Sequence, residues 1–106
     1  MTRIMYLRSN PKKTDYRGFP VSCVAIELHE DYIEYNTSTH CPSDKYDRKV
    51  ARSLAKERLS GHPKRLDGKF PTIHDVAKAI VSSIAEDKSE PARARKAARL
   101  WLKETS

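Results

Sequence analysis

Arginine is the residue type whose spacing in this sequence suggests binding chemistry. Arg95 and Arg99 stand four residues apart, so that on a helix both guanidinium groups can fork onto one phosphate-bearing ligand. Arg48, Arg52 and Arg58 form a second series earlier in the chain. We therefore predict that these five arginines bind an anionic group. Charged helix faces that only meet solvent are the alternative.

Two aromatic residues lie close in sequence to these cations. Tyr46 precedes Arg48 by two residues, and Phe70 lies in the basic segment 62–71. Aromatic rings beside cations can stack a nucleobase, so we predict this role for Tyr46 and Phe70. Packing in the core is the alternative.

Residues for catalysis or metal binding are not grouped in the sequence. Cys23, His40 and Cys41 come nearest to a metal cluster, but they form no C-x-x-C pair and no H-x-x-x-H spacing. His40 and Cys41 are neighbours on an expected strand and would point to opposite faces, which places His40 poorly as a base for Cys41. There is no glycine-rich phosphate loop. We expect no catalytic residues, no metal and no cofactor, and therefore no enzyme.

The charge of the chain favours anionic partners. Its 21 Lys and Arg against 14 Asp and Glu give a net charge of +7. Such an excess suits nucleic acid, nucleotides or an acidic protein, although it can serve solubility alone. Residues 21–42 hold four acidic residues and no Lys or Arg, whereas residues 43–69 hold nine basic and four acidic ones. The expected hairpin region is therefore acidic, and the first helical region is basic.

Two cysteines and the absence of long apolar runs indicate the compartment. Cys23 and Cys41 are expected to be free thiols, since so few cysteines are typical of a reducing compartment. Residues 1–10 lack the apolar run of a signal peptide, and no window is long enough to span a membrane. We expect a cytoplasmic protein that does not contact a membrane.

Three strands are expected in the first third of the chain. They are residues 2–9, 21–30 and 32–41, the last two joined as a hairpin around Glu30-Asp31. The expected register pairs Leu28 with Ile33, Ile26 with Tyr35 and Val24 with Thr37 on one face. It also sets Glu27 opposite Glu34, which requires a nearby cation or a different register.

The first helix is expected to begin after Pro42, with Ser43 or Asp44 as its cap, and to end at Gly61. A basic loop, residues 62–71, follows. The expected packing side is the stripe Tyr46, Val50 and Leu54, extended by Ala51, Ala55 and Leu59. Asp47 and Arg58 interrupt this apolar side. A long cation there must snorkel, pair or meet a ligand, which makes Arg58 a candidate site or interface residue.

Two further helices are expected. The second is capped by Thr72, with Asp75 three residues later, and carries a core stripe. That stripe is Ile73, Val76, Ala77, Ile80, Val81 and Ile84. The third starts near Pro91 and packs through Ala94, Ala97, Ala98, Trp101 and Leu102.

These elements predict an α+β fold. We expect a small antiparallel β-sheet of about three strands followed by three helices packed on it. Residues 1–106 are expected to form a single domain, β-rich over residues 1–42 and helical over residues 43–106. A homo-oligomer, dimer or higher, is expected, since a chain of this size buries more apolar surface as a dimer.

The junction between the third strand and the first helix carries a resemblance. Cys41, Pro42 and Asp44 are followed by an aromatic residue, an Arg-Lys pair, a small residue, Arg, Leu and Ala; these later positions are Tyr46, Arg48, Lys49, Ala51, Arg52, Leu54 and Ala55. The pattern covers about a fifth of the chain and resembles one in small phage-encoded proteins. Ala51 departs from it, because many such proteins have glycine there.

Within that group the chain looks similar to the anti-Thoeris sponges, phage anti-defence proteins that sequester cyclic ADP-ribose-type signals and, in some members, cyclic oligonucleotides. The resemblance implies a non-enzymatic binder of a small anionic cyclic nucleotide, acting in the host cytoplasm. No pocket residue of that family is carried over beyond the junction. Two alternatives remain: a nucleic-acid-binding regulator, and a protein that inhibits a host defence complex by docking on it, like an anti-CRISPR.

Overall fold

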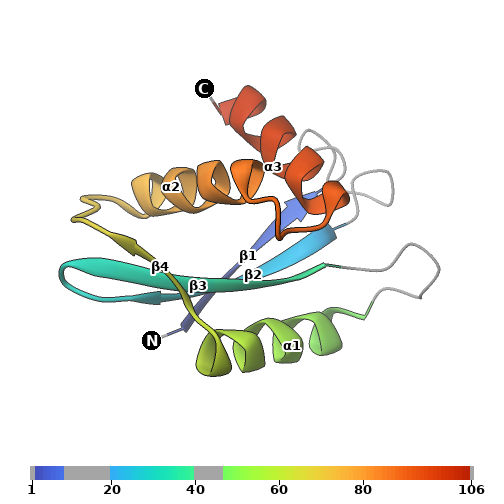
Figure 1. The fold of residues 1–106 in the computed structure, drawn as a ribbon, viewed down its shortest axis with the longest axis horizontal. Helices are drawn as coiled ribbons and strands as arrows, with labels where there is room; N and C mark the ends of the chain where they lie inside the picture. Colours follow the sequence, from blue (N-terminus) through green and yellow to red (C-terminus); the bar gives the residue numbers. More distant parts are fainter. Residues whose placement is uncertain (1, 9–19, 40–46, 106) are drawn as a thin grey trace.

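The computed structural model describes residues 2–8, 20–39 and 47–105. They form a four-stranded antiparallel sheet, in the order β1-β2-β3-β4, and three helices, so the predicted α+β class is confirmed. The elements are β1 (Thr2–Arg8), β2 (Pro20–Leu28), β3 (Tyr32–Thr39), α1 (Arg48–Gly61), β4 (Lys64–Asp67), α2 (Ile73–Glu86) and α3 (Ala92–Thr105). Figure 1 shows α1 on one face of the sheet and α2 with α3 on the other.

The hairpin of β2 and β3 has the predicted register. Val24 pairs with Thr37, Ile26 with Tyr35 and Leu28 with Ile33. The backbone N–H of His29 donates to the Tyr32 carbonyl across the turn at 3.0 Å, so the loop is as short as expected. The expected strand ends beyond Thr39 lie outside the described residues.

Glu27 and Glu34 do stand opposite each other, and polar groups compensate the repulsion. Glu27 accepts a hydrogen bond from the Thr2 hydroxyl at 2.9 Å, which is the main cause that lowers the pKa of Glu27. Glu34 lies 2.8 Å from His29 Nε2 and is paired across the ladder with Arg65 of β4. The compensating groups therefore come from the same chain.

β4 was not predicted and lies within the segment expected to be a basic loop. It pairs only with the first half of β3, from Tyr32↔Asp67 to Tyr35↔Lys64. The second half of β3 therefore has an edge without a strand neighbour among the described residues.

The cap predicted for α1 was wrong. Asp47 is the N-cap, and its carboxylate accepts from the backbone N–H groups of Lys49 and Val50 at 2.9 and 3.4 Å. Ser43 and Asp44 lie outside the described residues. Capping explains why an acid interrupts the helix side at Asp47. The end at Gly61 and the Thr72 cap of α2 are as predicted.

The two faces of the sheet carry cores of different size. The face under α2 and α3 buries the larger one, around Leu7, Val24, Tyr35 and Ile80. The face under α1 buries only Cys23, Ala25, Ala55 and Leu59. The sheet therefore lies between two helical layers, α1 on one face and α2 with α3 on the other (Figure 1).

The buried side of α1 differs from the predicted stripe. Ala55 and Leu59 are buried, and Ala51 packs against them. Val50 and Leu54 are 53% and 38% exposed, so two of the five described residues of the expected stripe face solvent. On α2 the predicted stripe is buried, except that Ile73 is 50% exposed and Ala77 is partly buried. On α3 the three stripe alanines are buried, and Trp101 and Leu102 pack on the core.

Candidate anion-binding surface

Four cations form one stripe along α1, which we call the α1 stripe. Its members are Arg48, Lys49, Arg52 and Lys56, and all four residues are exposed. At about 100° per residue they fall within an arc of about 100° on the side of the helix that faces β1. No acidic residue of α1 lies in that arc, because Glu57 falls on the far side.

Tyr6 of β1 anchors the two arginines of the stripe. Arg52 Nε donates to the Tyr6 hydroxyl at 2.8 Å, and the Arg48 guanidinium carbon lies 5.2 Å from the centre of the Tyr6 ring. Tyr6 is partly buried and packs against the small core under α1. The stripe therefore has a fixed aromatic group at its inner margin.

The position of these cations works against the intrinsic stability of α1. A helix has a positive partial charge at its N-terminus, where acidic residues stabilise and basic residues destabilise it. The first turn of α1 holds Arg48 and Lys49 and no acid, and the first turn of α3 has no acid either. Apart from the Asp47 cap, this end of α1 attracts anions.

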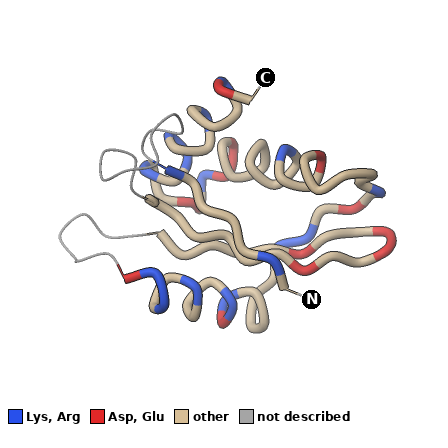
Figure 2. The backbone as a smooth tube through the Cα atoms, turned by 180° about the vertical axis from the view of Figure 1, so that it is seen from behind, with Lys and Arg blue, Asp and Glu red and all other residues tan. Residues whose placement is uncertain are grey.

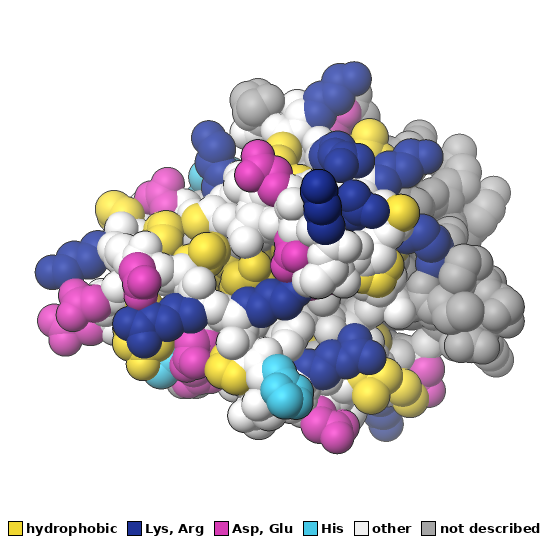
Figure 3. Space-filling model, viewed as in Figure 1, with side chains coloured by type: hydrophobic (Ala, Val, Ile, Leu, Met, Phe, Trp, Pro, Cys, Tyr) yellow, Lys and Arg dark blue, Asp and Glu magenta, His cyan; other side chains and the backbone are white. Residues whose placement is uncertain are grey.

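Charge is also segregated along the molecule. Figure 2 shows Lys and Arg along α1 and at the start of α3, towards the end where β1 finishes. Acidic residues gather at the opposite end, around the tip of the β2–β3 hairpin. Figure 3 shows a further group of basic side chains over α3. A polyanion would approach the basic end and be repelled from the hairpin tip.

Arg58, predicted as a site or interface residue, holds the edge of the sheet. Its Nη1 donates to the backbone carbonyl of Thr37 at 2.9 Å, beyond the end of β4. The Asn36 side chain completes this edge: its oxygen accepts from the Thr37 N–H at 2.8 Å, and its nitrogen donates to the His62 carbonyl at 2.7 Å. A structural partner thus accounts for a cation on the packing side of α1.

Arg95 and Arg99 lie on α3, across the sheet from the α1 stripe. Arg99 Nη2 lies 3.5 Å from the Ala85 carbonyl at the end of α2. Arg95 Nε is buried and has no hydrogen-bond partner among the described residues. The hollow beside Arg58 is lined by residues 36, 37, 39, 64 and 89–91 and includes neither arginine of α3. The five predicted arginines are therefore divided between the two faces of the sheet.

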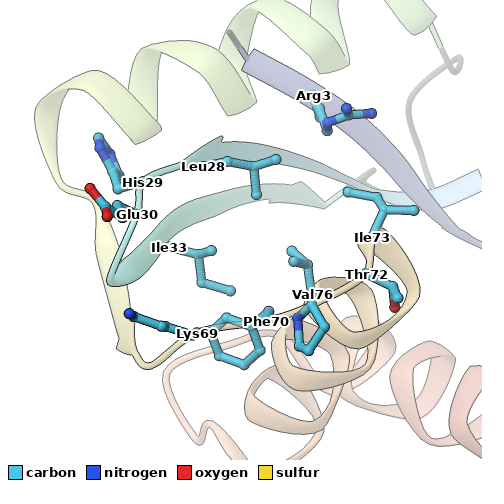
Figure 4. Close-up of a pocket in the computed structure, with 11 residues that line it drawn as sticks. Arg3, Leu28, His29, Glu30, Ile33, Lys69, Phe70, Thr72, Ile73 and Val76 are labelled. Atoms are coloured by element: carbon cyan, nitrogen blue, oxygen red, sulfur yellow. The ribbon is translucent and has the colours of Figure 1, made fainter.

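The two predicted stacking residues have different outcomes. Tyr46 lies outside the described residues. Phe70 packs on the main core and lines a cavity of about 400 Å³ between the hairpin and the start of α2. Figure 4 shows Leu28, Ile33 and Val76 around this cavity, with Phe70 on its floor in that view.

The polar rim of this cavity is electrically mixed. Arg3 and Lys69 lie on it, as does Thr72 at the N-terminus of α2, and these favour an anion. Glu30 also lines the cavity, and Asp31 lies 3.7 Å from Lys69 Nζ. The cavity can accept a flat apolar group, and cations and carboxylates share its rim.

A buried ion cluster joins the sheet edge to the loop between α2 and α3. Glu90 is 4% exposed and accepts from Lys64 Nζ at 2.6 Å and from the Thr37 hydroxyl at 2.9 and 3.0 Å. Lys64 also bonds Asp87 at 2.9 Å. The sequence did not predict this cluster.

The cluster shifts the proton affinities of its members. Burial alone would lower the pKa of Lys64, but hydrogen bonds to Glu90 and Asp87 outweigh it and raise this pKa. Hydrogen bonds from the hydroxyl of Ser89, from Lys64 and from the backbone of Ser89 lower the pKa of Asp87 to about 2. All these groups are paired, so the cluster is structural.

Within residues 2–8, 20–39 and 47–105, no three His, Cys, Asp or Glu side chains are grouped so as to hold a metal ion. In the same stretches of the chain, none of the helices has the length and apolarity to cross a membrane. Comparisons with models of known protein families, with curated proteins and with solved structures gave no match. The function is therefore inferred from the geometry of this chain.

Proposed function

We propose that this protein is a non-enzymatic nucleic-acid-binding protein that contacts phosphates through the α1 stripe. The observation that carries the proposal is the gathering of Arg48, Lys49, Arg52 and Lys56 on one exposed side of a helix, with Tyr6 of β1 in contact with both arginines. Cations beside an aromatic ring are the usual equipment for binding single strands without sequence readout.

The open shape of the stripe favours a polymer over a small ligand. From Arg48 to Lys56 the helix rises about 12 Å, enough to follow several phosphates of a backbone. A small cyclic nucleotide is instead expected in an enclosed site where cations converge. The division of the predicted arginines between the two faces of the sheet favours the same choice.

The test is a titration of fluorescent single-stranded and double-stranded oligonucleotides at several salt concentrations. We expect the logarithm of the affinity to fall linearly with the logarithm of the salt concentration. The double variant Lys49→Gln/Lys56→Gln should reduce this slope by about 2, because two phosphate contacts are lost. Neither lysine has a structural partner shown among the described residues.

The matched control is Lys78→Gln/Lys88→Gln, which removes the same charge from two exposed lysines of α2 and the loop after it. We expect the control to keep the wild-type slope. Equal loss in both double variants would mean that only net charge matters, and it would overturn the assignment to the α1 stripe. An absence of binding at low salt would overturn the proposal itself.

A second candidate is the capture of a small anionic cyclic nucleotide, as the junction resemblance implies for a phage anti-defence sponge. The cavity lined by Phe70 favours it, because an aromatic ring and apolar walls suit a base while Arg3 and Lys69 suit a phosphate. Titration calorimetry with cyclic ADP-ribose isomers and cyclic di- and trinucleotides tests it. Heat that disappears in Phe70→Ala supports it, and no heat from any of them rejects it.

A further inference from the structure

We infer that β1 pairs with β1 of a second copy, so that two four-stranded sheets join into one antiparallel sheet of eight strands. β1 is the terminal strand of the sheet, and none of the described elements pairs with its outer edge. Such an edge is a template for another strand. The interface itself does not depend on the proposed function. Its consequence for binding, that the α1 stripes of both copies contact one nucleic-acid strand, rests on the proposed function.

The outer edge of β1 presents backbone N–H and C=O groups that a second strand can bond. Hydrogen-bonded and non-hydrogen-bonded residue pairs alternate along an antiparallel ladder. His29 and Tyr32, at the turn, are a hydrogen-bonded pair. Through the two registers, this alternation points the N–H and C=O groups of Thr2, Ile4 and Tyr6 away from β2. The same alternation points Thr37 outward on β3, where its two groups are bound by Asn36 and Arg58. The described residues show no such side-chain bonds at β1.

The side chains of β1 protect its edge only through the charges of Arg3 and Arg8. Within Thr2–Arg8 there is no proline and no lysine, and the irregularity of pairing lies at the end, between Leu7 and Arg8. Ile4, Met5 and Tyr6 are only partly buried. α1 packs over β2 and β3, which leaves Ile4 and Tyr6 at the open margin of its layer. A second strand would cover these apolar groups.

A second copy fits better than an unrelated strand because one end of β1 lies in an acidic region and the other end in a basic region (Figure 2), so two antiparallel copies have complementary charges. Antiparallel pairing centred on Met5 sets Ile4 opposite Tyr6 of the second copy and Thr2 opposite Arg8 of the second copy. Thr2 is bonded to Glu27 at the acidic end of the molecule, whereas β1 finishes at the basic end. Each acidic end therefore lies beside a basic end.

The pairing would bring the two α1 stripes to one groove. α1 lies about two strand spacings from the outer edge of β1, and strands are about 4.8 Å apart, so the two helix axes would stand about 20 Å from each other. The floor would be the paired β1 strands with both Tyr6 rings. Eight cations then face one channel, and a bound nucleic-acid strand would relieve their repulsion.

Sedimentation of the full chain without nucleic acid tests the interface. We expect a dimer in wild type, and Ile4→Pro should raise the dimer dissociation constant by about 30-fold, because it removes an outward N–H in each copy. Ile4 does not bond β2 in this ladder, so β1 keeps its pairing inside the protomer. The control Ile4→Val retains the N–H group and should stay dimeric. Circular dichroism checks that Ile4→Pro is folded.

A cysteine cross-link locates the axis independently of that variant. With Cys23 and Cys41 replaced by serine, Met5→Cys should form a disulfide-linked dimer under mild oxidation, because Met5 stands opposite its own copy. Arg3→Cys should not, since it stands opposite Leu7 of the second copy. A monomer at all concentrations, or a dimer that neither responds to Ile4→Pro nor cross-links through Met5→Cys, would overturn the inference.

The proposed function is tested separately. If Lys49→Gln/Lys56→Gln loses nucleic-acid binding while the dimer persists, both ideas are supported. If wild type dimerises and binds no nucleic acid, the function fails while the interface stands. If the folded Ile4→Pro monomer binds with the full wild-type salt slope, the shared groove is rejected.

Discussion

At the β3 edge the outward N–H and C=O of Thr37 both meet side chains, whereas at the β1 edge the described residues offer the outward groups no strand. Both edges belong to one antiparallel sheet and present the same kinds of backbone groups. The β3 edge is covered first by β4, then by Asn36 and Arg58, with the ion pair of Lys64 and Glu90 beside them.

The contrast shows that cations in this protein have two different uses. Arg58 and Lys64 complete the β3 edge and are fixed by short bonds to Thr37, Asp87 and Glu90. The cations of the α1 stripe lie on the side nearer β1 and are exposed. A count of arginines cannot separate these uses, but the hydrogen-bond partners can.

Replacing Glu90 should cause the largest loss of stability at the β3 edge. In Glu90→Ala, Lys64 loses its most buried partner and the Thr37 hydroxyl is left without its acceptor. We expect a loss of about 3 kcal/mol in the free energy of unfolding, measured by urea denaturation. Glu86→Ala, at an exposed position of α2, should change it by less than about 0.5 kcal/mol. Similar values for the two variants would contradict a structural role for the cluster.

Acid should weaken the same edge at a defined pH. The pKa of Asp87 is lower in the folded protein, about 2, than its ordinary value of 3.8, so its stabilising contribution is present above pH 4 and is lost as the pH falls towards 2. We expect about 1 to 2 kcal/mol from this group, because its side chain is 26% exposed. Asp87→Asn should flatten the unfolding free energy between pH 4 and pH 2. If the variant and the wild type lose the same unfolding free energy between pH 4 and pH 2, other carboxylates cause the acid destabilisation.

Opening the β3 edge directly should have a smaller effect on stability. Arg58→Ala leaves the Thr37 carbonyl without its donor, which we expect to lower the free energy of unfolding by about 1 kcal/mol. The variant should also self-associate through the β3 edge, because that edge is then open. Light scattering and urea denaturation check both effects. Lys56→Ala, on the same helix, is the control and should leave both unchanged.

The features predicted correctly from the sequence are those with local signals. Alternating apolar residues set the register of the β2–β3 hairpin, because a shift by one residue would turn every side chain to the wrong face. The apolar repeat of α2 and its Thr72 cap likewise depend on neighbours in the chain. The alanine side of α3 was found in the same way.

The features that were missed depend on contacts distant in sequence. β4 has four residues, Lys64–Asp67, and becomes a strand only because β3 offers an edge. The buried side of α1 is chosen by a small core around Cys23, which leaves no room for Val50 and Leu54. Glu90 is buried because Lys64 and Thr37 converge on it from the sheet. The periodicity of the sequence does not predict these long-range contacts.

The smallness of the core under α1 has a kinetic consequence. Cys23 is 1% exposed beneath Ala55 and Leu59, and burial raises the pKa of its thiol, although Arg52 and Lys56 act in the opposite direction. A thiol reagent can reach it only when α1 lifts from the sheet. In a variant that lacks Cys41, the rate of labelling therefore measures how often this layer opens while the core under α2 and α3 stays closed. A ligand bound to the α1 stripe would lower the rate at which Cys23 is labelled.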